Sequence, residues 1–208
     1  QRQMCIRDRS MDSLKVKNIL RRVLKLRVMY RPGLVESCNT GKRIGMNIIA
    51  LADKNWAIGN NGRLLVDIPE DKKLFRGETY GKVVVMGRKT YEGLPNQSAL
   101  EGRKNIVLTN NLNYKAKDVL ICHSVQEVLE QLKSYDSKDV YIIGGGQIYE
   151  QFLPYCDTAH ITRVDYKYQA DTYITDFDKL DGWRVTARSE EHTYFDICYE
   201  FVCYQKEK

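Results

Sequence analysis

From Met46 onward, short apolar runs alternate along the chain with segments of helical pattern. Six runs have the length and the apolar, often β-branched, content of buried strands, and they span residues 46–52, 82–86, 104–109, 118–121, 139–143 and 157–164. Pro69 can open a helix that continues to about Tyr80, and residues 88–94 have the pattern of a shorter helix. Buried strands separated by helices predict an α/β fold with a largely parallel sheet covered on both faces.

Three further patterns complete the expected elements. Ser124 and Glu127 have the spacing of a capping box before an apolar helical segment. The run YIIGGGQIYEQFL predicts a strand that passes through three glycines into a helix. After Trp183 the chain carries long strand patterns without helices, rich in aromatic and β-branched residues, which indicates an antiparallel hairpin at the edge of the sheet.

Composition narrows the class of protein. The 208 residues are 43% hydrophobic, and the purely apolar runs are far shorter than the roughly 18 residues that span a bilayer. We therefore exclude a membrane-spanning or globally disordered protein. The six cysteines never occur as CxxC and there are three histidines, so we expect no bound metal, no disulfide scaffold and reduced thiols in the cytoplasm.

The positive charge of the chain lies in its first part. Residues 1–45 contain 12 Lys and Arg against 3 Asp and Glu, a net charge of +9, whereas the remainder contains 21 against 24, or −3. Residues 14–30 could form a basic amphipathic helix, so binding to RNA or to a membrane surface, or a transit peptide, stays open for this segment. Our main hypothesis is that residues 1–45 are a non-native or disordered extension and that residues 46–208 are the functional domain, with no nucleic-acid or membrane partner.

Two strand–glycine–helix junctions are candidate anion sites. One contains Gly144, Gly145 and Gly146, and the other is VVVMGRKTYEGL, which places Arg88 and Lys89 at the start of a helix. Glycines let the backbone approach a ligand closely, and a helix N-terminus offers unpaired amides to a phosphate. Cations there oppose the helix dipole, and a bound anion would resolve that conflict. A tight structural turn and a solvated pair of surface cations are the alternative interpretations.

Asp71 lies in the first turn of the helix that begins at Pro69, four residues before Phe75. This spacing puts the carboxylate and the aromatic ring on one helical face, where an acid can lie in apolar surroundings. The alternative is a carboxylate that only complements the helix dipole.

Taken in order, the segments ALADKNWAIGNNGRLLVDIPEDKKLF, VVMGRKTYEGLP, GRKNIVLT, VYIIGGGQIYEQFLP, HITRVD and DTYI resemble dihydrofolate reductase. The resemblance covers essentially all of residues 46–208. It implies a three-layer α/β fold in which a mainly parallel, eight-stranded sheet is flanked by four helices and ends in a C-terminal antiparallel hairpin. It also implies NADPH-dependent reduction of 7,8-dihydrofolate to 5,6,7,8-tetrahydrofolate, by hydride transfer to pterin C6 and protonation at N5.

The resemblance also assigns site residues. Asp71 matches the catalytic carboxylate that holds the pterin ring, and Arg103 matches the arginine that binds the α-carboxylate of the glutamyl tail. The implied substrate-binding residues are Asp71, Phe75, Leu94, Arg103 and Thr162. The implied NADPH-binding residues are Ala52, Ile58, Gly59, Gly87, Arg88, Lys89, Thr90, Thr109, Gly144, Gly145, Gly146, Gln147, Ile148 and Tyr149.

Two departures from the family pattern stand out. Val66 occupies the place of a tryptophan that in many members helps to hold a water near the pterin, and a valine has no indole N–H to offer. Thr109 and Asn110 stand where a serine often helps to bind the 2′-phosphate, which leaves Arg88 as the expected charge contact. A pyrimidine reductase of the riboflavin pathway, with the same fold and cofactor, is the alternative function. We further expect a monomer located in the cytoplasm.

Overall fold

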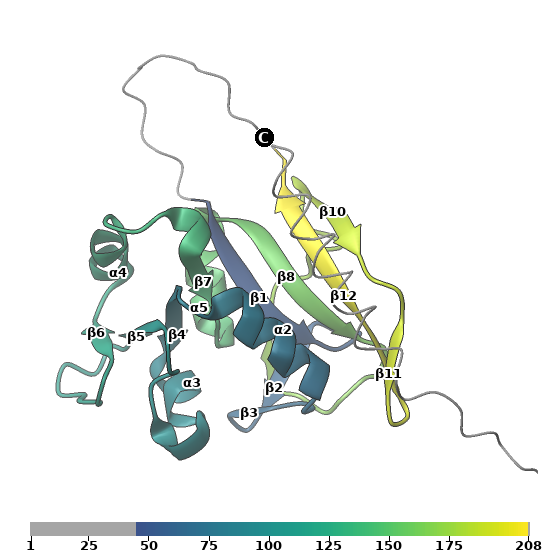
Figure 1. Ribbon diagram of the computed structural model, residues 1–208, viewed down its shortest axis with the longest axis horizontal. Coiled ribbons are helices and arrows are strands. Elements are labelled where there is room, and N and C mark those ends of the chain that lie inside the picture. The colour runs from purple at the N-terminus through teal and green to yellow at the C-terminus, as the bar shows by residue number, and fades with distance from the viewer. Residues whose placement is uncertain (1–44, 208) are drawn as a thin grey trace, which may run out of the picture. The chain divides into compact units, whose positions relative to one another are not determined.

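The computed structural model describes residues 45–207, and the helix expected over residues 14–30 lies outside this range. Eight strands form a continuous main sheet, and a short ninth strand pairs at its side (Figure 1). The order across the sheet is β10 (Trp183–Arg188), β12 (Ile197–Lys206), β8 (Cys156–Val164), β1 (Met46–Ala52), β7 (Val140–Ile142), β4 (Val83–Gly87), β5 (Lys104–Leu108) and β6 (Leu120–Cys122), with β11 (His192–Tyr194) paired to β12.

The direction of the strands confirms the expected mainly parallel sheet. The six strands from β8 to β6 run parallel to one another. β12 is antiparallel to β8, and both β10 and β11 are antiparallel to β12, so the C-terminal segment forms the predicted hairpin at one edge.

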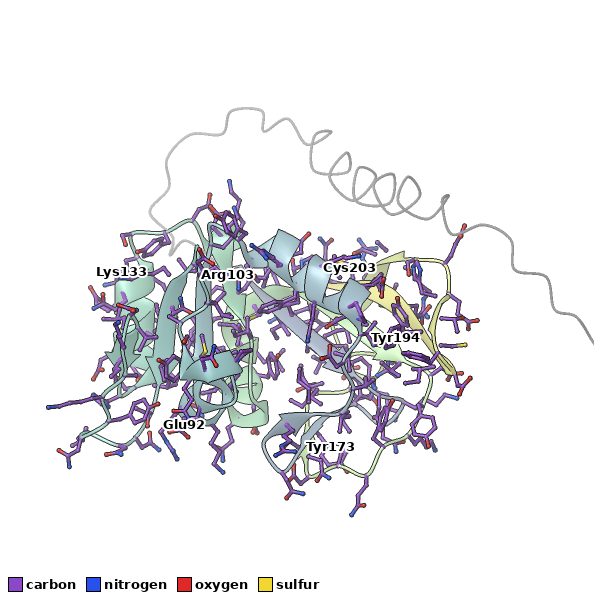
Figure 2. The ribbon with its side chains drawn as sticks, turned by 60° about the horizontal axis from the view of Figure 1, so that its bottom comes forward. Glu92, Arg103, Lys133, Tyr173, Tyr194 and Cys203 are labelled. Carbon is purple, nitrogen blue, oxygen red and sulfur yellow. The ribbon has the colours of Figure 1, made fainter. Side chains whose placement is uncertain are left out.

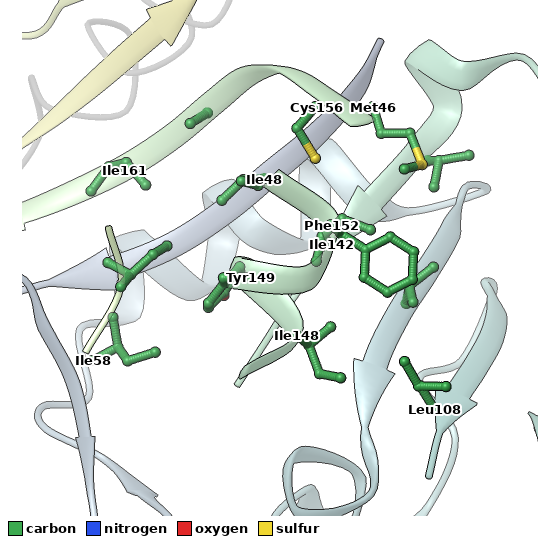
Figure 3. Packing of buried hydrophobic residues seen from close by; sticks show 14 of the residues in the cluster. Met46, Ile48, Ile58, Leu108, Ile142, Ile148, Tyr149, Phe152, Cys156 and Ile161 are labelled. Carbon is green, nitrogen blue, oxygen red and sulfur yellow. The ribbon is translucent and has the colours of Figure 1, made fainter. Parts of the chain in front are cut away.

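Four α-helices of residues 45–207 cover the two faces of the sheet, and they are α2 (Pro69–Thr79), α3 (Arg88–Glu92), α4 (Val125–Leu132) and α5 (Gly146–Phe152). Successive side chains of β4 point alternately to the two faces of the sheet. Val83 and Val85 belong to the buried cluster that contains residues of α4 and α5, part of which is drawn in Figure 3. Val84 and Met86 pack with residues of α2 and α3. The three layers therefore follow from the period of two in a buried strand.

The ends of the helices follow local chemistry. α3 ends at Glu92, two residues earlier than predicted, because Gly93 is its C-cap. One of the two hydrogen bonds of the predicted capping box forms as expected, because the Ser124 side chain accepts from the Glu127 amide at 3.1 Å. The second differs: the Glu127 carboxylate accepts from the amide of His123, not of Ser124, at 2.7 Å. Three short 3₁₀ turns complete the helical structure, at Pro95–Gln97, Ser137–Asp139 and Leu153–Tyr155.

A second, small sheet was not predicted. It contains β3 (Arg63–Leu64), β2 (Ala57–Asn60) and β9 (Thr172–Tyr173) in that order. β2 and β3 lie in the asparagine-rich segment after β1, and β9 comes from a loop more than 100 residues later in the chain. This sheet gives the segment that follows β1 a defined position.

Within residues 45–207, no helix is long and apolar enough to cross a bilayer, and no cluster of three or more His, Cys, Asp or Glu could hold a metal ion. The four cysteines of this range are unpaired thiols, and Cys122 and Cys156 are buried.

Candidate active site

The candidate residues gather where the parallel strands of the main sheet end. β1, β7, β4 and β5 are adjacent and parallel, so their C-terminal ends lie along one edge. Ala52 ends β1, Gly87 ends β4, Thr109 follows β5 and Gly144 follows β7. Ligands of open α/β sheets bind outside this edge, which is where the sequence placed most of its candidates.

Asp71 is held by a threonine of the main sheet. Its carboxylate lies in the first turn of α2, and the Oγ1 hydroxyl of Thr162 on β8 donates to its Oδ1 at 2.6 Å. Thr162 itself is 2% exposed. Burial raises the pKa of the Asp71 carboxyl above its ordinary value, and the hydrogen bond from Thr162 opposes that shift in part. The two residues are 91 positions apart in sequence, and α2 and β8 bring them together.

The charge of Asp71 acts on two nearby phenols. Tyr149 of α5 is buried and donates from its hydroxyl to the carbonyl of Ile49 at 2.8 Å. Burial raises the pKa of Tyr149, and the negative charge of Asp71 raises it further. Burial also raises the pKa of Tyr199 on β12 to about 12, with the charges of Glu70 and Asp71 adding to the effect. Both phenols are therefore neutral hydrogen-bonding groups at physiological pH.

A second part of the site is apolar and ends in an arginine. Phe75 and Leu94 pack against the buried cluster under α2 and α3. The guanidinium carbon of Arg103 lies 5.6 Å from the centre of the Phe75 ring, and Figure 2 labels Arg103 among the other side chains. The Nε of Arg103 is buried and, within residues 45–207, has no hydrogen-bond partner. Burial lowers the pKa of Arg103, and the nearby charge of Arg76 lowers it further, whereas the charge of Glu101 opposes the shift in part.

The two strand–glycine–helix junctions are in direct contact. The amide of Gly87 donates to the carbonyl of Gly144 at 2.8 Å. A Cβ on Gly87 would lie 2.9 Å from Cγ1 of Ile148, and a Cβ on Gly146 would lie 2.8 Å from the carbonyl oxygen of Tyr173. Gly144 has φ +110°, a conformation that other residues rarely adopt. Glycine at these positions therefore leaves room for the Ile148 side chain and for the backbone at Tyr173, and it permits the positive φ of Gly144.

The side chain of Thr90 lies at the same place, because a Cβ on Gly145 would be 3.5 Å from Thr90 Oγ1. Gly145 is the N-cap of α5, and no side chain caps that helix. The first amides of α5 therefore remain available at the junction. Gln147 in the first turn is exposed.

The charge conflict expected at the start of α3 has an internal solution. Arg88 Nη1 lies 2.9 Å from both carboxylate oxygens of Glu92, one turn further along the helix. Glu92 therefore offsets part of the unfavourable charge of Arg88 at the helix start, a partner that sequence reasoning overlooked, and the expected contact of Arg88 with a bound anion stays a prediction. Lys89 is exposed.

The apolar residues assigned to the cofactor come together in the core. Ala52, Ile58, Ile148 and Tyr149 belong to one buried cluster, and Figure 3 shows the last three from close by. Gly59 is buried next to Ile58, and a Cβ there would lie 2.9 Å from the carbonyl oxygen of Arg63.

Thr109 and Val66 lie apart from this cluster. Thr109 is 7% exposed, and its hydroxyl accepts from the amide of Asn111 at 3.2 Å. Val66 packs half-buried against a separate apolar group that includes Ile68 and Tyr199. The place expected for a tryptophan is thus filled by hydrocarbon.

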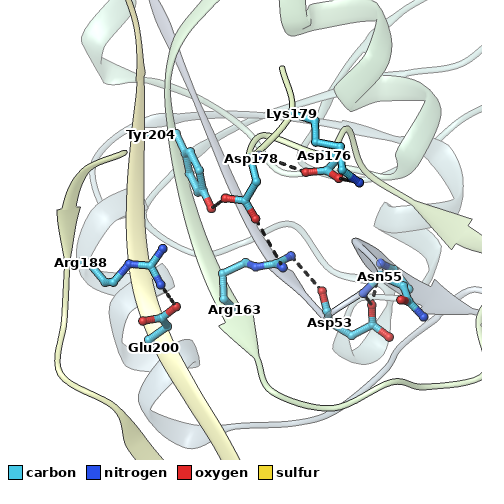
Figure 4. A network of polar contacts seen from close by, with 10 residues as sticks. Asp53, Asn55, Arg163, Asp176, Asp178, Lys179, Arg188, Glu200 and Tyr204 are labelled. Carbon is cyan, nitrogen blue, oxygen red and sulfur yellow. Dashed lines mark hydrogen bonds and ion pairs between the residues drawn. The ribbon is translucent and has the colours of Figure 1, made fainter. Parts of the chain in front are cut away.

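Sequence reasoning missed a polar network beside the end of β1 (Figure 4). Asp53 is fully buried, and its carboxylate accepts from the amides of Asn55, Ala57 and Tyr168 at 2.7 to 2.9 Å. Arg163 of β8 donates to the Asp53 carbonyl at 2.9 Å. An aspartate at the start of a polar turn is a signal for an Asx turn, in which its side chain accepts from the amide two residues later, but the partner on β8 leaves no trace in local sequence.

Comparisons with known proteins agree with this geometry. The family model described as dihydrofolate reductase matches residues 45–206. The dihydrofolate reductase type 3 of Salmonella typhimurium is 35% identical over 144 residues, which cover 69% of this chain and 86% of that protein. The dihydrofolate reductase of Enterococcus faecium is 39% identical over 127 residues, which cover 61% of this chain and 75% of that protein.

A solved structure is similar over nearly its whole length. The dihydrofolate reductase of Enterococcus faecalis, complexed with NADP(H) and RAB-propyl, superposes with a TM-score of 0.70 at 29% identity, covering 80% of this chain and 98% of that one.

Proposed function

The chain belongs to the dihydrofolate reductase family, and we propose that it reduces 7,8-dihydrofolate to 5,6,7,8-tetrahydrofolate with NADPH at the site around Asp71. The observation that carries the proposal is the pairing of Asp71 with Thr162 at 2.6 Å, which holds one carboxylate of raised pKa beside the edge of a parallel sheet. A weakly basic heterocycle such as a pterin offers N–H donors that match such a carboxylate.

Asp71 has two roles in this proposal. Its carboxylate orients the pterin ring, and it supports the protonation of N5, either through water or by stabilising a reactive tautomer. Burial makes the carboxyl hold its proton to a higher pH than an exposed aspartate does. Thr162 keeps Oδ1 in place, which leaves Oδ2 for the substrate. Val66 has no side-chain N–H with which to hold a water, so the polar side chains described around this part of the site are Asp71, Thr162 and the phenols of Tyr149 and Tyr199.

The residues at the strand ends fit NADPH. The glycine junctions at Gly87 and Gly144–Gly146 bring two backbones within hydrogen-bond distance, and a Cβ on Gly87 or Gly146 would collide with a neighbour. Close backbone approach and free helix amides suit a pyrophosphate. When bound, the cofactor supplies a hydride. In this proposal Arg88 and Thr90 would bind its phosphates, and Ala52, Ile58, Gly59 and Tyr149 would hold the nicotinamide and exclude water.

In this proposal Arg103 binds the carboxylate in the tail of the substrate. A guanidinium beside an aromatic ring, with a buried Nε that has no partner among the described residues, fits a carboxylate at the end of an aromatic group. Phe75 and Leu94 form the apolar wall between Asp71 and this arginine. A pyrimidine substrate of the riboflavin pathway is not favoured, because it has no such carboxylate to pair with Arg103.

The direct test is oxidation of NADPH by the purified chain, followed by absorbance with dihydrofolate or with the pyrimidine substrate of the riboflavin pathway. We expect turnover with dihydrofolate only. Turnover with the pyrimidine alone would replace the proposal, and turnover with neither would remove it. A monomeric state and a cytoplasmic location remain predictions, which light scattering and cell fractionation can test.

A further inference from the structure

The turn that follows β1 is held in an unfavourable backbone conformation by groups from distant elements. Trp56 has φ +63°, in the left-handed region that a large residue rarely occupies, and its side chain is 5% exposed. Such a conformation is unfavourable for a residue with a side chain and persists only where the surroundings fix it. The turn leads directly into β2, which carries Ile58 and Gly59.

Arg163 of β8 contacts this turn in two ways. Its Nη1 donates to the carbonyl of Asp53 at 2.9 Å, and its guanidinium carbon lies 3.8 Å from the centre of the Trp56 ring. The same carbonyl accepts from the Trp56 amide at 3.0 Å, so the arginine binds the turn at its closing hydrogen bond. The side chain of Arg163 is only 16% exposed, which strengthens both contacts.

Asp178 in turn holds the guanidinium of Arg163. The Nη2 of Arg163 lies 3.8 Å from Oδ2 of Asp178, whose other oxygen accepts from the hydroxyl of Tyr204 at 2.7 Å. Tyr204 and Phe177 also pack against the Trp56 ring, with centroids 5.9 and 5.7 Å away. Figure 4 shows how Arg163, Asp178 and Tyr204 converge from separate segments.

The neighbour of Arg163 in the sequence is Thr162, which points to the opposite face of the sheet and holds Asp71. Two successive residues of β8 therefore serve the two halves of the proposed site. Thr162 holds Asp71, the carboxylate proposed to bind the substrate, and Arg163 holds the turn beside the proposed cofactor site. Because Arg163 contacts the backbone before Ile58 and leaves the Asp71 side of the sheet untouched, its loss should disturb only the cofactor side.

We propose that Arg163 is a positioning residue for the cofactor: by holding the Asp53 carbonyl and the Trp56 ring, it fixes the turn that places Ile58 and Gly59 against the nicotinamide. This inference rests on the proposed function. It predicts that Arg163 governs NADPH binding and the rate of hydride transfer, with little effect on dihydrofolate binding.

The test uses the full chain and three variants. Arg163→Met keeps an unbranched apolar stem and removes the guanidinium with its donors and charge, whereas Arg163→Lys keeps the charge without the planar fork. Arg184→Met is the matched control, because Arg184 is an exposed arginine of the same sheet, with its side chain 69% exposed. The measurements are KM for each substrate, single-turnover hydride transfer and thermal unfolding.

We expect Arg163→Met to raise KM for NADPH about tenfold or more and to slow hydride transfer, with KM for dihydrofolate within about threefold of wild type. Arg163→Lys should show the same selectivity with a rise of about threefold. Arg184→Met should match wild type. If Arg163→Met does not fold, Arg163→Lys alone decides the outcome: an unchanged KM for NADPH would overturn the inference.

A spectroscopic measurement separates positioning from general destabilisation. The chain has two tryptophans, so Trp183→Phe leaves Trp56 as its sole indole. In that background, Arg163→Met should shift the Trp56 emission to the red and increase its quenching by acrylamide, whereas Arg184→Met should do neither. Equal rises in both KM values with an unmoved Trp56 emission would contradict a positioning role. A wild-type chain without dihydrofolate turnover would remove the proposed function, whereas an active wild type with unaffected Arg163 variants would remove this inference alone.

Discussion

At the scale of single residues, Asp71 lies where folding stability and catalysis make opposite demands. Burial raises its pKa above the ordinary value of 3.8, so its charged form is disfavoured in the folded state. By linkage, Asp71 therefore makes its most favourable contribution to the free energy of unfolding below pH 3.8, where it is protonated in both the folded and the unfolded chain. This contribution is lost as the pH rises through the pKa of Asp71 in the folded state. A carboxylate kept in such a place despite this cost is typical of a functional group.

Asp71→Asn distinguishes this interpretation from a simple helix-dipole role. Asparagine still accepts from Thr162 but has no charge to desolvate, so we expect a variant at least as stable as wild type at neutral pH, with its advantage disappearing in acid. Loss of a favourable dipole contact would instead lower stability by about 0.3 to 1 kcal/mol. Unfolding by denaturant across the acid-to-neutral range measures the difference.

The same variant should be poor in catalysis. We expect hydride transfer to slow by about two orders of magnitude or more at neutral pH, and to recover in part in acid, where the pterin gains its proton from solvent. Single turnovers are needed, since slow product release can mask a chemical defect in kcat. A rate within about threefold of wild type from pH 6 to 9 would remove Asp71 from the mechanism.

Arg103 should affect one ligand only. Because its proposed partner is the carboxylate of the substrate tail, Arg103→Leu should weaken dihydrofolate binding by about 2 to 5 kcal/mol and leave NADPH affinity nearly unchanged. Arg103→Lys keeps the charge but not the fork, so it should recover only part of the loss. Titration of each ligand measures both effects, and equal weakening of the two would refute the assignment.

At the scale of elements, α3 couples a cation to an anion in a way that bears on cofactor choice. Arg88 is proposed to bind the 2′-phosphate of NADPH, yet in this structure it pairs with Glu92. The carboxylate offsets the unfavourable position of a cation at a helix start, and it also competes with a phosphate for the guanidinium.

Paired variants of α3 can separate these effects. Arg88→Ala should raise KM for NADPH far more than KM for NADH, because only NADPH carries the extra anion. Glu92→Gln removes the competing carboxylate, so it should lower KM for NADPH and leave KM for NADH unchanged. If neither variant alters the preference for NADPH over NADH, the selectivity lies outside α3.

The elements also show where sequence reasoning reaches its limit. The strands of the parallel sheet were predictable because burial on both faces makes them continuous apolar runs, as β1 and β4 show. β3 and β9 have two residues each and no periodicity, so nothing local announces them. The Asp71–Thr162 pair came from a family resemblance, since a contact across 91 residues has no signature in one sequence. Arg163 was missed for the same reason.

At the scale of the whole molecule, the first strand of the described residues is β1, which begins at Met46. Met46 is fully buried and pairs with Cys156 of β8, and β1 lies between β8 and β7 in the middle of the sheet. The Asn47 side chain donates to the carbonyls of Lys138 and Val140 at 2.9 and 3.1 Å. These contacts are all made by residues from Met46 onward, and they fix the start of β1 in the sheet.

We therefore expect a chain that starts at Met46 to fold cooperatively and to turn over dihydrofolate at close to the rate of the full chain. Residues 1–45 carry a net charge of +9, so removing them should also reduce any salt-sensitive binding to RNA or anionic vesicles. Asn47→Ala in the shortened chain is the sensitivity control: it removes the side-chain donor to the carbonyls of Lys138 and Val140, the second in a buried hydrogen bond, and should cost about 1 to 3 kcal/mol. Denaturant unfolding and steady-state turnover of the two shortened chains and the full chain give the comparison. The full chain is the reference for both measurements. If the shortened chain loses cooperative unfolding or most of the activity that the full chain has, part of the functional domain lies before Met46.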